Sequence, residues 1–75
     1  MPHLIVKCYA GKTEEQKKLL AQKLTAAVTE VFACPEGAVS VGIEDYDPSE
    51  WKQVWEEEIG PKMDKLYKQP GYSLD

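Results

Sequence analysis

Polar and apolar residues alternate in two short stretches of this 75-residue chain. In residues 3–9, Leu4, Val6 and Cys8 point to one side and the residues between them to the other, which is the period of a β-strand. A second alternation runs through residues 39–44, with Val41 and Ile43 on the apolar side. The pattern therefore predicts two β-strands.

The segment between these strands repeats its apolar residues every three or four positions, as one face of an α-helix does. Thr13 is the predicted N-cap, and Gln16 three residues later completes a capping box. We expect the helix to reach about Ala33, before the break at residues 34–37. Its predicted apolar stripe consists of Leu20, Leu24, Ala27, Val28 and Val31.

A strand, a crossover helix and a second strand form a β-α-β unit, in which the strands are parallel and the connection is right-handed. The fold class is therefore α/β (α+β), and residues 1–75 form a single domain. A sheet of two parallel strands is not stable by itself in water. We expect two chains to join their sheets into one of four strands, giving a homodimer.

The second half of the chain begins with another cap, in which Asp47 is the N-cap and Pro48 the first helical residue. The apolar spacing of three and four continues through Gly60 and Pro61, which predicts one kinked helix over residues 48–68. Its predicted stripe consists of Trp51, Val54, Trp55, Ile59, Met63, Leu66 and Tyr67.

Charge and composition exclude several classes of partner. The formal charge is −4, with nine lysines and no arginine, which argues against binding to nucleic acid. No segment has the length of apolar sequence that a membrane span or a signal peptide requires. Cys8 and Cys34 are interpreted as reduced, small apolar residues, so we expect a cytoplasmic protein.

The chemistry that remains centres on Pro2. One histidine and two distant cysteines give no metal-ligand spacing and no catalytic triad. If Met1 is removed, Pro2 becomes an N-terminal secondary amine at the start of a strand, and partial desolvation favours its neutral, basic form. The structural alternatives are a proline that only begins a strand and, for the neighbouring His3, a partly exposed residue without a catalytic role.

Three stretches resemble the 4-oxalocrotonate tautomerase family: residues 2–7 (PHLIVK), residues 11–17 (GKTEEQK) and the second strand with Val39, Ser40 and Val41. Trp51, Trp55, residues 58–61 (EIGP) and residues 68–73 (KQPGYS) are similar to the dimeric para-phenylpyruvate tautomerase type. The resemblance covers nearly the whole chain. It implies keto-enol tautomerisation of an enol or 2-oxo acid by the Pro2 amine as general base, without a cofactor.

The resemblance also implies the substrate-binding residues. The family's two carboxylate-binding arginines fall on Lys12 and Ser40, and its apolar pocket wall falls near Trp51. His3 is a further candidate. Since lysine and serine cannot replace a bidentate arginine, we expect a monoacid with an aromatic or apolar tail, such as a phenylenolpyruvate-like compound. For Trp51, packing at the start of the helix is the alternative.

Two other functions are compatible with the sequence. If Met1 is retained, the Pro2 nitrogen is an amide without basic character, which favours a non-catalytic protein of the same fold that binds a small molecule or another protein. Hydrolytic dehalogenation by the same proline is the third reading. It requires a carboxylate that activates water, and no Asp or Glu in the sequence is singled out for that role.

Overall fold

The computed structural model describes residues 1–74. Strand β1 (His3–Tyr9) leads through a short turn into helix α1 (Glu14–Phe32), and strand β2 (Ser40–Tyr46) follows after a single 3-10 turn, η1 (Glu36–Ala38). The strands pair in parallel, with His3 opposite Ser40 and Tyr9 opposite Tyr46. The predicted β-α-β unit is therefore confirmed.

Local sequence signals account for the bounds of α1. The Thr13 hydroxyl accepts from the backbone N–H of Gln16 at 3.1 Å, and the Gln16 side chain accepts from the N–H of Thr13 at 2.9 Å. The helix ends where Ala33 adopts a left-handed conformation with φ 53°. Both bounds agree with the sequence prediction.

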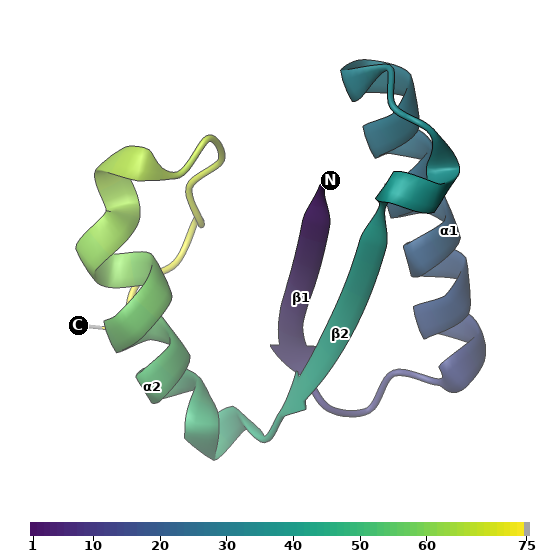
Figure 1. Cartoon of the computed structure of the whole chain (residues 1–75). Helices are drawn as coiled ribbons and strands as arrows, with labels where there is room; N and C mark the ends of the chain where they lie inside the picture. The colour runs from purple at the N-terminus through teal and green to yellow at the C-terminus, as the bar shows by residue number, and fades with distance from the viewer. Residues whose placement is uncertain (75) are drawn as a thin grey trace.

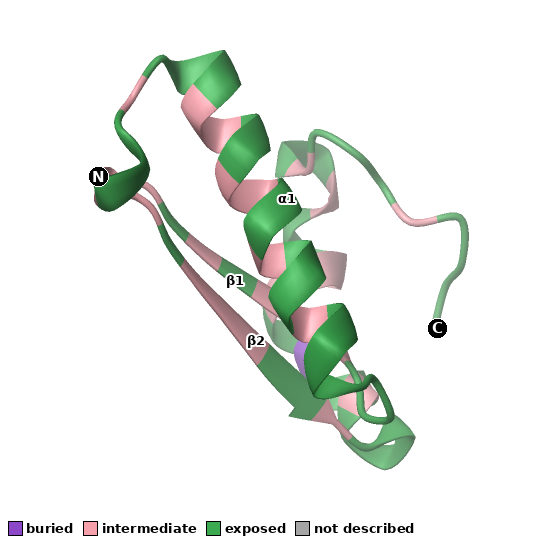
Figure 2. Ribbon diagram, turned by 90° about the vertical axis from the view of Figure 1, so that its right-hand side faces the viewer, coloured by how far each residue is buried: buried purple, intermediate pink, exposed green. Residues whose placement is uncertain are grey.

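Helix α1 lies along one face of the strand pair, with its half-buried residues on the side toward the strands (Figure 2). Leu24 and Val28 are half-buried, but the predicted stripe is not fully covered. Leu20 is 39% exposed and Val31 is 76% exposed, and no residue of α1 is buried. Leu20 lines a small cavity together with Val6 and Ile43, so it faces the strands as the stripe predicts. Val31, near the end of the helix, stays open to solvent because the two strands are too narrow to cover the whole stripe.

Residues 48–65 form a helical arm on the opposite side of the strands from α1 (Figure 1). The arm consists of a 3-10 turn η2 (Pro48–Glu50), helix α2 (Trp51–Val54), a π-helical turn η3 (Trp55–Ile59) and a 3-10 segment η4 (Gly60–Lys65). The capping box predicted for Asp47 is present, with the Glu50 side chain accepting from the Asp47 N–H at 2.8 Å.

The kink in the arm has two causes near Pro61. Pro61 has no backbone N–H, so it cannot donate a hydrogen bond to the preceding turn of the helix. Before Pro61, the helix widens into the π turn η3. Gly60 is required by space, because a Cβ on it would lie 2.9 Å from Trp55 Nε1. The arm therefore bends where the sequence predicted.

The end of the arm differs from the prediction. Helical structure stops at Lys65, and Leu66 has an extended backbone with ψ 127°, so the predicted end at residue 68 was too late. Tyr67 is fully exposed, which corrects its assignment to the apolar stripe. The 3-10 segment after Pro61 has three residues per turn, so it rotates later residues out of the phase that the α-helical spacing assumes.

The buried core of this single chain is very small. Val54 and Trp55, both in the arm, are the buried hydrophobic residues among those described, at 5% and 7% exposure. Large side chains such as Phe32, which is 66% exposed, remain open to solvent. An isolated two-stranded sheet is only marginally stable in water. The exposed apolar side chains of this single chain therefore form a surface that is suited to contact with another molecule.

Candidate active site

The start of β1 brings three of the sequence-predicted site residues together: Pro2, His3 and Ser40, here called the N-terminal cluster. The Ser40 N–H donates to the carbonyl of Pro2 at 3.1 Å, and His3 Nδ1 lies 2.5 Å from the Ser40 hydroxyl oxygen. Parallel register produces this contact, because it sets residues 3 and 40 side by side. A hydroxyl and an imidazole thus lie next to the residue whose nitrogen is the candidate base.

Pro2 itself is half-buried, whereas Met1 is fully exposed. An exposed first residue is accessible to an aminopeptidase. While Met1 is attached, the Pro2 nitrogen is a tertiary amide and carries no proton. Removal of Met1 would leave Pro2 with a partly desolvated secondary amine at the start of the strand.

The other end of β1 holds the remaining two candidates, Lys12 and Trp51, in a cavity of about 490 Å³. Gly11, with φ 116°, makes the turn that carries Lys12 away from the strand. We call this cavity the aromatic pocket; its lining residues are Lys7, Cys8, Tyr9, Lys12, Trp51, Tyr72 and Leu74.

Trp51 organises the aromatic pocket. Its ring meets Tyr9 edge to face with centroids 5.4 Å apart, and Tyr46 in the same way at 6.1 Å. Its indole N–H donates to the Tyr72 hydroxyl oxygen at 2.9 Å. The pocket therefore has fixed aromatic walls, and Trp51 both packs at the start of the arm and lines a cavity, so the two readings of this residue are compatible.

The two lysines of the aromatic pocket differ in their electrostatic surroundings. Lys7 pairs with Glu58 of the arm, and the hydrogen bond to this carboxylate raises the pKa of the Lys7 ammonium group. Lys12 makes no ion pair with any residue of the described chain, 1–74. A single uncompensated cation beside aromatic walls suits a ligand with one negative charge and a flat apolar group.

Within one chain the two groups of residues are far apart. Pro2 precedes a strand of seven residues and Lys12 follows it, so at the usual rise per residue they are about 20 Å apart. A small acid cannot contact both in the same chain. The structure therefore brings Pro2, His3 and Ser40 together, and Lys12 and Trp51 together, but not all five.

Sequence reasoning missed Tyr9 and Tyr72 as pocket residues. Tyr9 had been placed correctly on the strand face opposite to Cys8, but nothing in the pattern said that Trp51 would cover it. Tyr72 belonged to a motif quoted for the family resemblance, and no role had been assigned to it. Its position 21 residues after Trp51, in a tail without regular structure, gives no periodic signal.

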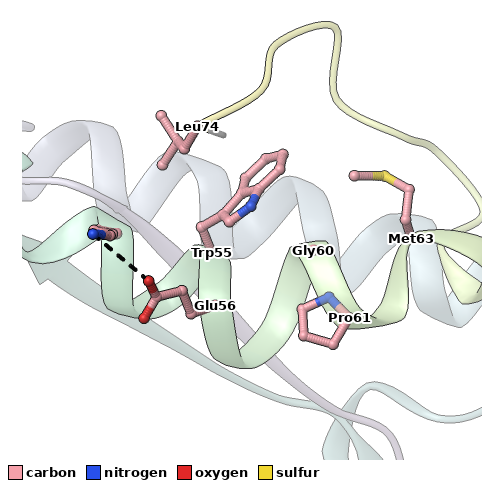
Figure 3. Close-up of a pocket in the computed structure, with 7 residues that line it drawn as sticks. Trp55, Glu56, Gly60, Pro61, Met63 and Leu74 are labelled. Atoms are coloured by element: carbon pink, nitrogen blue, oxygen red, sulfur yellow. Dashed lines mark ion pairs between the residues drawn. The ribbon is translucent and has the colours of Figure 1, made fainter.

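A second cavity, of about 510 Å³, lies on the arm beside Trp55, Gly60, Pro61 and Met63 (Figure 3). Its lysine, Lys52, is 3.9 Å from the carboxylate of Glu56, so the two charges offset each other. This cavity has no reactive nitrogen and no unpaired cation among its lining residues. It is therefore a weaker candidate than the aromatic pocket.

Metal and membrane sites are not indicated in residues 1–74. No group of three or more His, Cys, Asp or Glu side chains is arranged to hold a metal ion there. Within the same range, no helix has the length and apolar character for a membrane crossing. Cys8 and Cys34 are free thiols.

Comparison with known proteins identifies the family. The model of the family described as "Tautomerase enzyme" matches residues 2–54, which include the N-terminal cluster, Lys12 and Trp51. The chain belongs to the tautomerase family. It is therefore an enzyme of the isomerase class, with the β-α-β fold of that family and a small-molecule substrate.

Relatives cover the chain almost from end to end. Tautomerase PptA of Klebsiella pneumoniae subsp. pneumoniae is 43% identical over 75 residues, which are 99% of this chain and 100% of the relative. Tautomerase PptA of Escherichia coli is 33% identical over 76 residues, covering 100% of this chain and 99% of the relative.

A solved structure supports the fold. The crystal structure of TomN, a 4-oxalocrotonate tautomerase homologue in the tomaymycin biosynthetic pathway, superposes with a TM-score of 0.65 and 32% identity. The match covers 67% of this chain and 77% of TomN.

Proposed function

We propose that this tautomerase interconverts the enol and keto forms of a monoacid with an aromatic or apolar tail, with the amine of Pro2 as general base after Met1 is removed. A phenylenolpyruvate-like acid is the expected kind of substrate, and the reaction needs no cofactor. The observation that carries the proposal is the aromatic pocket, in which Lys12, without an ion pair in residues 1–74, suits one carboxylate.

The proposed proton transfer needs only the substrate and the amine of Pro2. In ketonisation, the neutral amine of Pro2 accepts the proton of the enol hydroxyl, and the resulting ammonium group returns a proton to the substrate carbon. Half-burial of Pro2 disfavours its charged form, which is what a base working near neutral pH requires. The Ser40 hydroxyl and His3 lie close enough to this end of the strand to orient the acid.

Assembly into a homodimer would complete the site. If the free edges of the two β1 strands pair about a twofold axis, the strands run antiparallel, so the start of one lies beside the end of the other. Pro2 of one chain would then lie about 5 Å, one strand spacing, from the partner strand's end, where the partner's Lys12 follows.

Pairing through β2 is the other way to build a four-stranded sheet. It would separate the two β1 strands by three spacings, about 14 Å, so Pro2 would lie too far from the second chain's aromatic pocket for one small acid. We therefore favour pairing through the β1 edge.

We also propose a cytoplasmic location, with which the free thiols of Cys8 and Cys34 are compatible.

The direct test uses protein whose intact mass shows that Met1 is absent. This material should ketonise phenylenolpyruvate, measured by loss of the enol absorbance. Pro2→Ala replaces the secondary amine by a primary one, and we expect a rate loss of about 100-fold or more. A form that retains Met1 should be equally slow, because its nitrogen is an amide. Full rates in both forms would contradict proline catalysis.

Retention of Met1 is the alternative to this mechanism, because an amide nitrogen on Pro2 cannot act as a base. Intact mass on material from the natural source separates the two cases. Uniform retention of Met1, together with binding of aromatic monoacids without turnover, would contradict catalysis by Pro2.

A further inference from the structure

The tail, residues 66–74, folds back over the helical arm and delivers Tyr72 to the aromatic pocket. The Gln69 side-chain amide donates to the carbonyl of Met63 at 2.9 Å, which fixes the start of the return. The Tyr72 ring then packs against Trp55, with centroids 5.4 Å apart and the planes inclined by 46°. Since Trp55 is buried, it provides a rigid support for the Tyr72 ring.

The hydroxyl of Tyr72 is held by a contact that leaves its own proton free. The Trp51 indole N–H can only donate, and it donates to the Tyr72 oxygen at 2.9 Å. A phenol hydroxyl is both donor and acceptor, so this contact uses its acceptor side. Within residues 1–74 no side chain or carbonyl accepts the Tyr72 proton, and Tyr72 is one of the residues that line the aromatic pocket.

The aromatic pocket lacks a second hydrogen-bond donor for a bound carboxylate, and the Tyr72 hydroxyl would provide it. Lys12 is the pocket lysine that has no ion pair within residues 1–74. A lysine ammonium group binds a carboxylate as a point charge, whereas an arginine binds it through two parallel hydrogen bonds. The chain contains no arginine, so no guanidinium is available for both carboxylate oxygens. Tyr72 lines the same cavity as Lys12, and its hydroxyl proton has no acceptor within residues 1–74.

We propose that Tyr72 is a carboxylate-binding residue, whose hydroxyl donates to one oxygen of the bound monoacid while Lys12 neutralises the charge. Trp51 positions the hydroxyl, and the tail thereby sets the specificity of the pocket for acids over neutral analogues. The inference rests on the proposed function for the identity of the ligand, but binding at this pocket does not depend on the chemistry at Pro2.

The test measures binding without turnover. The probe is 3-phenylpropanoate, which has no enol to convert, and 3-phenylpropanamide is its neutral counterpart; both are titrated calorimetrically into the Met1-free protein. Tyr72→Phe keeps the ring against Trp55 and removes only the hydroxyl. We expect this variant to bind the acid about tenfold more weakly, as for a lost hydrogen bond to a charged group, and to bind the amide unchanged.

Tyr67→Phe is the matched control, because Tyr67 is fully exposed and undergoes the same chemical change. It should bind both probes like the unaltered protein. Equal affinity of Tyr72→Phe and the unaltered protein for 3-phenylpropanoate would overturn the inference, as would an equal loss for acid and amide, which indicates a structural role. Tight acid binding that depends on Tyr72, with no turnover of any enol, would instead contradict the proposed function alone.

Discussion

The two ends of strand β1 carry different parts of the proposed reaction site. At its start, Pro2, the candidate base, lies next to Ser40 and His3. At its end, Lys12 and Trp51 line a cavity with aromatic walls, and Lys12 has no ion pair within residues 1–74. One end has the chemistry and the other has the binding surface.

This division teaches that the strand acts as a spacer of about 20 Å between base and pocket. If Pro2 and Lys12 belong to one reaction site, as proposed, a single chain cannot complete that site. In the proposed homodimer, each chain would contribute the start of its β1 to one site and the end to the other. The most informative experiments are those that damage one end at a time.

The largest effect is expected from combining two inactive chains. Pro2→Ala removes the base, and Lys12→Glu places a repelling charge in the aromatic pocket. A heterodimer purified with two different tags should recover about half of the unaltered activity, because one of its two sites has an intact Pro2 and an intact Lys12. If the site were built within one chain, the heterodimer would remain as inactive as its parents.

A smaller loss is expected from the pocket end alone. Lys12→Met removes the cation, and kcat/KM for an aromatic enol monoacid should fall roughly 10- to 100-fold, the range for a hydrogen bond to a charged group. Lys12→Arg should restore most of it. Lys18→Met is the control, because Lys18 is an exposed lysine of α1 without an ion pair among the described residues. Comparable losses in both Met variants would exclude a specific role for Lys12.

The smallest effect concerns the contacts that hold the arm against the strand. Glu58 raises the pKa of Lys7, so the stability from this pair is fully present below about pH 10.4, the ordinary lysine value, and is lost as pH rises through the higher folded value. The hydrogen bond from Tyr46 to the Glu44 carboxylate likewise raises the pKa of the Tyr46 phenol. The stability from this contact is therefore also lost at high pH. Urea midpoints should therefore stay level from neutral pH to about 10 and then decline.

Lys7→Met separates this contribution. The variant should have a lower urea midpoint than the unaltered protein at pH 8, and a smaller difference between pH 8 and pH 11. Lys52→Met serves as the comparison, because Lys52 and Glu56 form an exposed pair with a separation of 3.9 Å that contributes little. A pH profile of Lys7→Met that parallels the unaltered protein would show that the pair does not stabilise the arm.

Much of the fold follows from local sequence signals. Thr13 with Gln16, and Asp47 with Glu50, fixed both helix starts because a capping box uses side chains within one turn. The end of the arm did not follow, since the 3-10 segment after Pro61 changes the number of residues per turn. Its apolar spacing still looked α-helical, so Tyr67 was assigned to a face that it does not share.

The sequence predicted candidate residues for the site, but not which of them lie close together in the folded chain. The β-α-β connection predicted that the strands are parallel, but their register, which sets His3 opposite Ser40, is seen only in the structure. The separation of Lys12 from Pro2 was implicit in the strand length, yet resemblance to a family presents both as one site. Tyr72 could not be found from periodicity, because a tail without regular structure brings it to Trp51.

The small buried core has a consequence for the enzyme in the cell. Val54 and Trp55 are the buried hydrophobic residues among those described, and Val31 and Phe32 are open to solvent, so the proposed homodimer would gain part of its stability from association. In that case abundance would regulate output. Below the dissociation constant of the pair, the concentration of complete sites, and with it total turnover, would fall with the square of the amount synthesised.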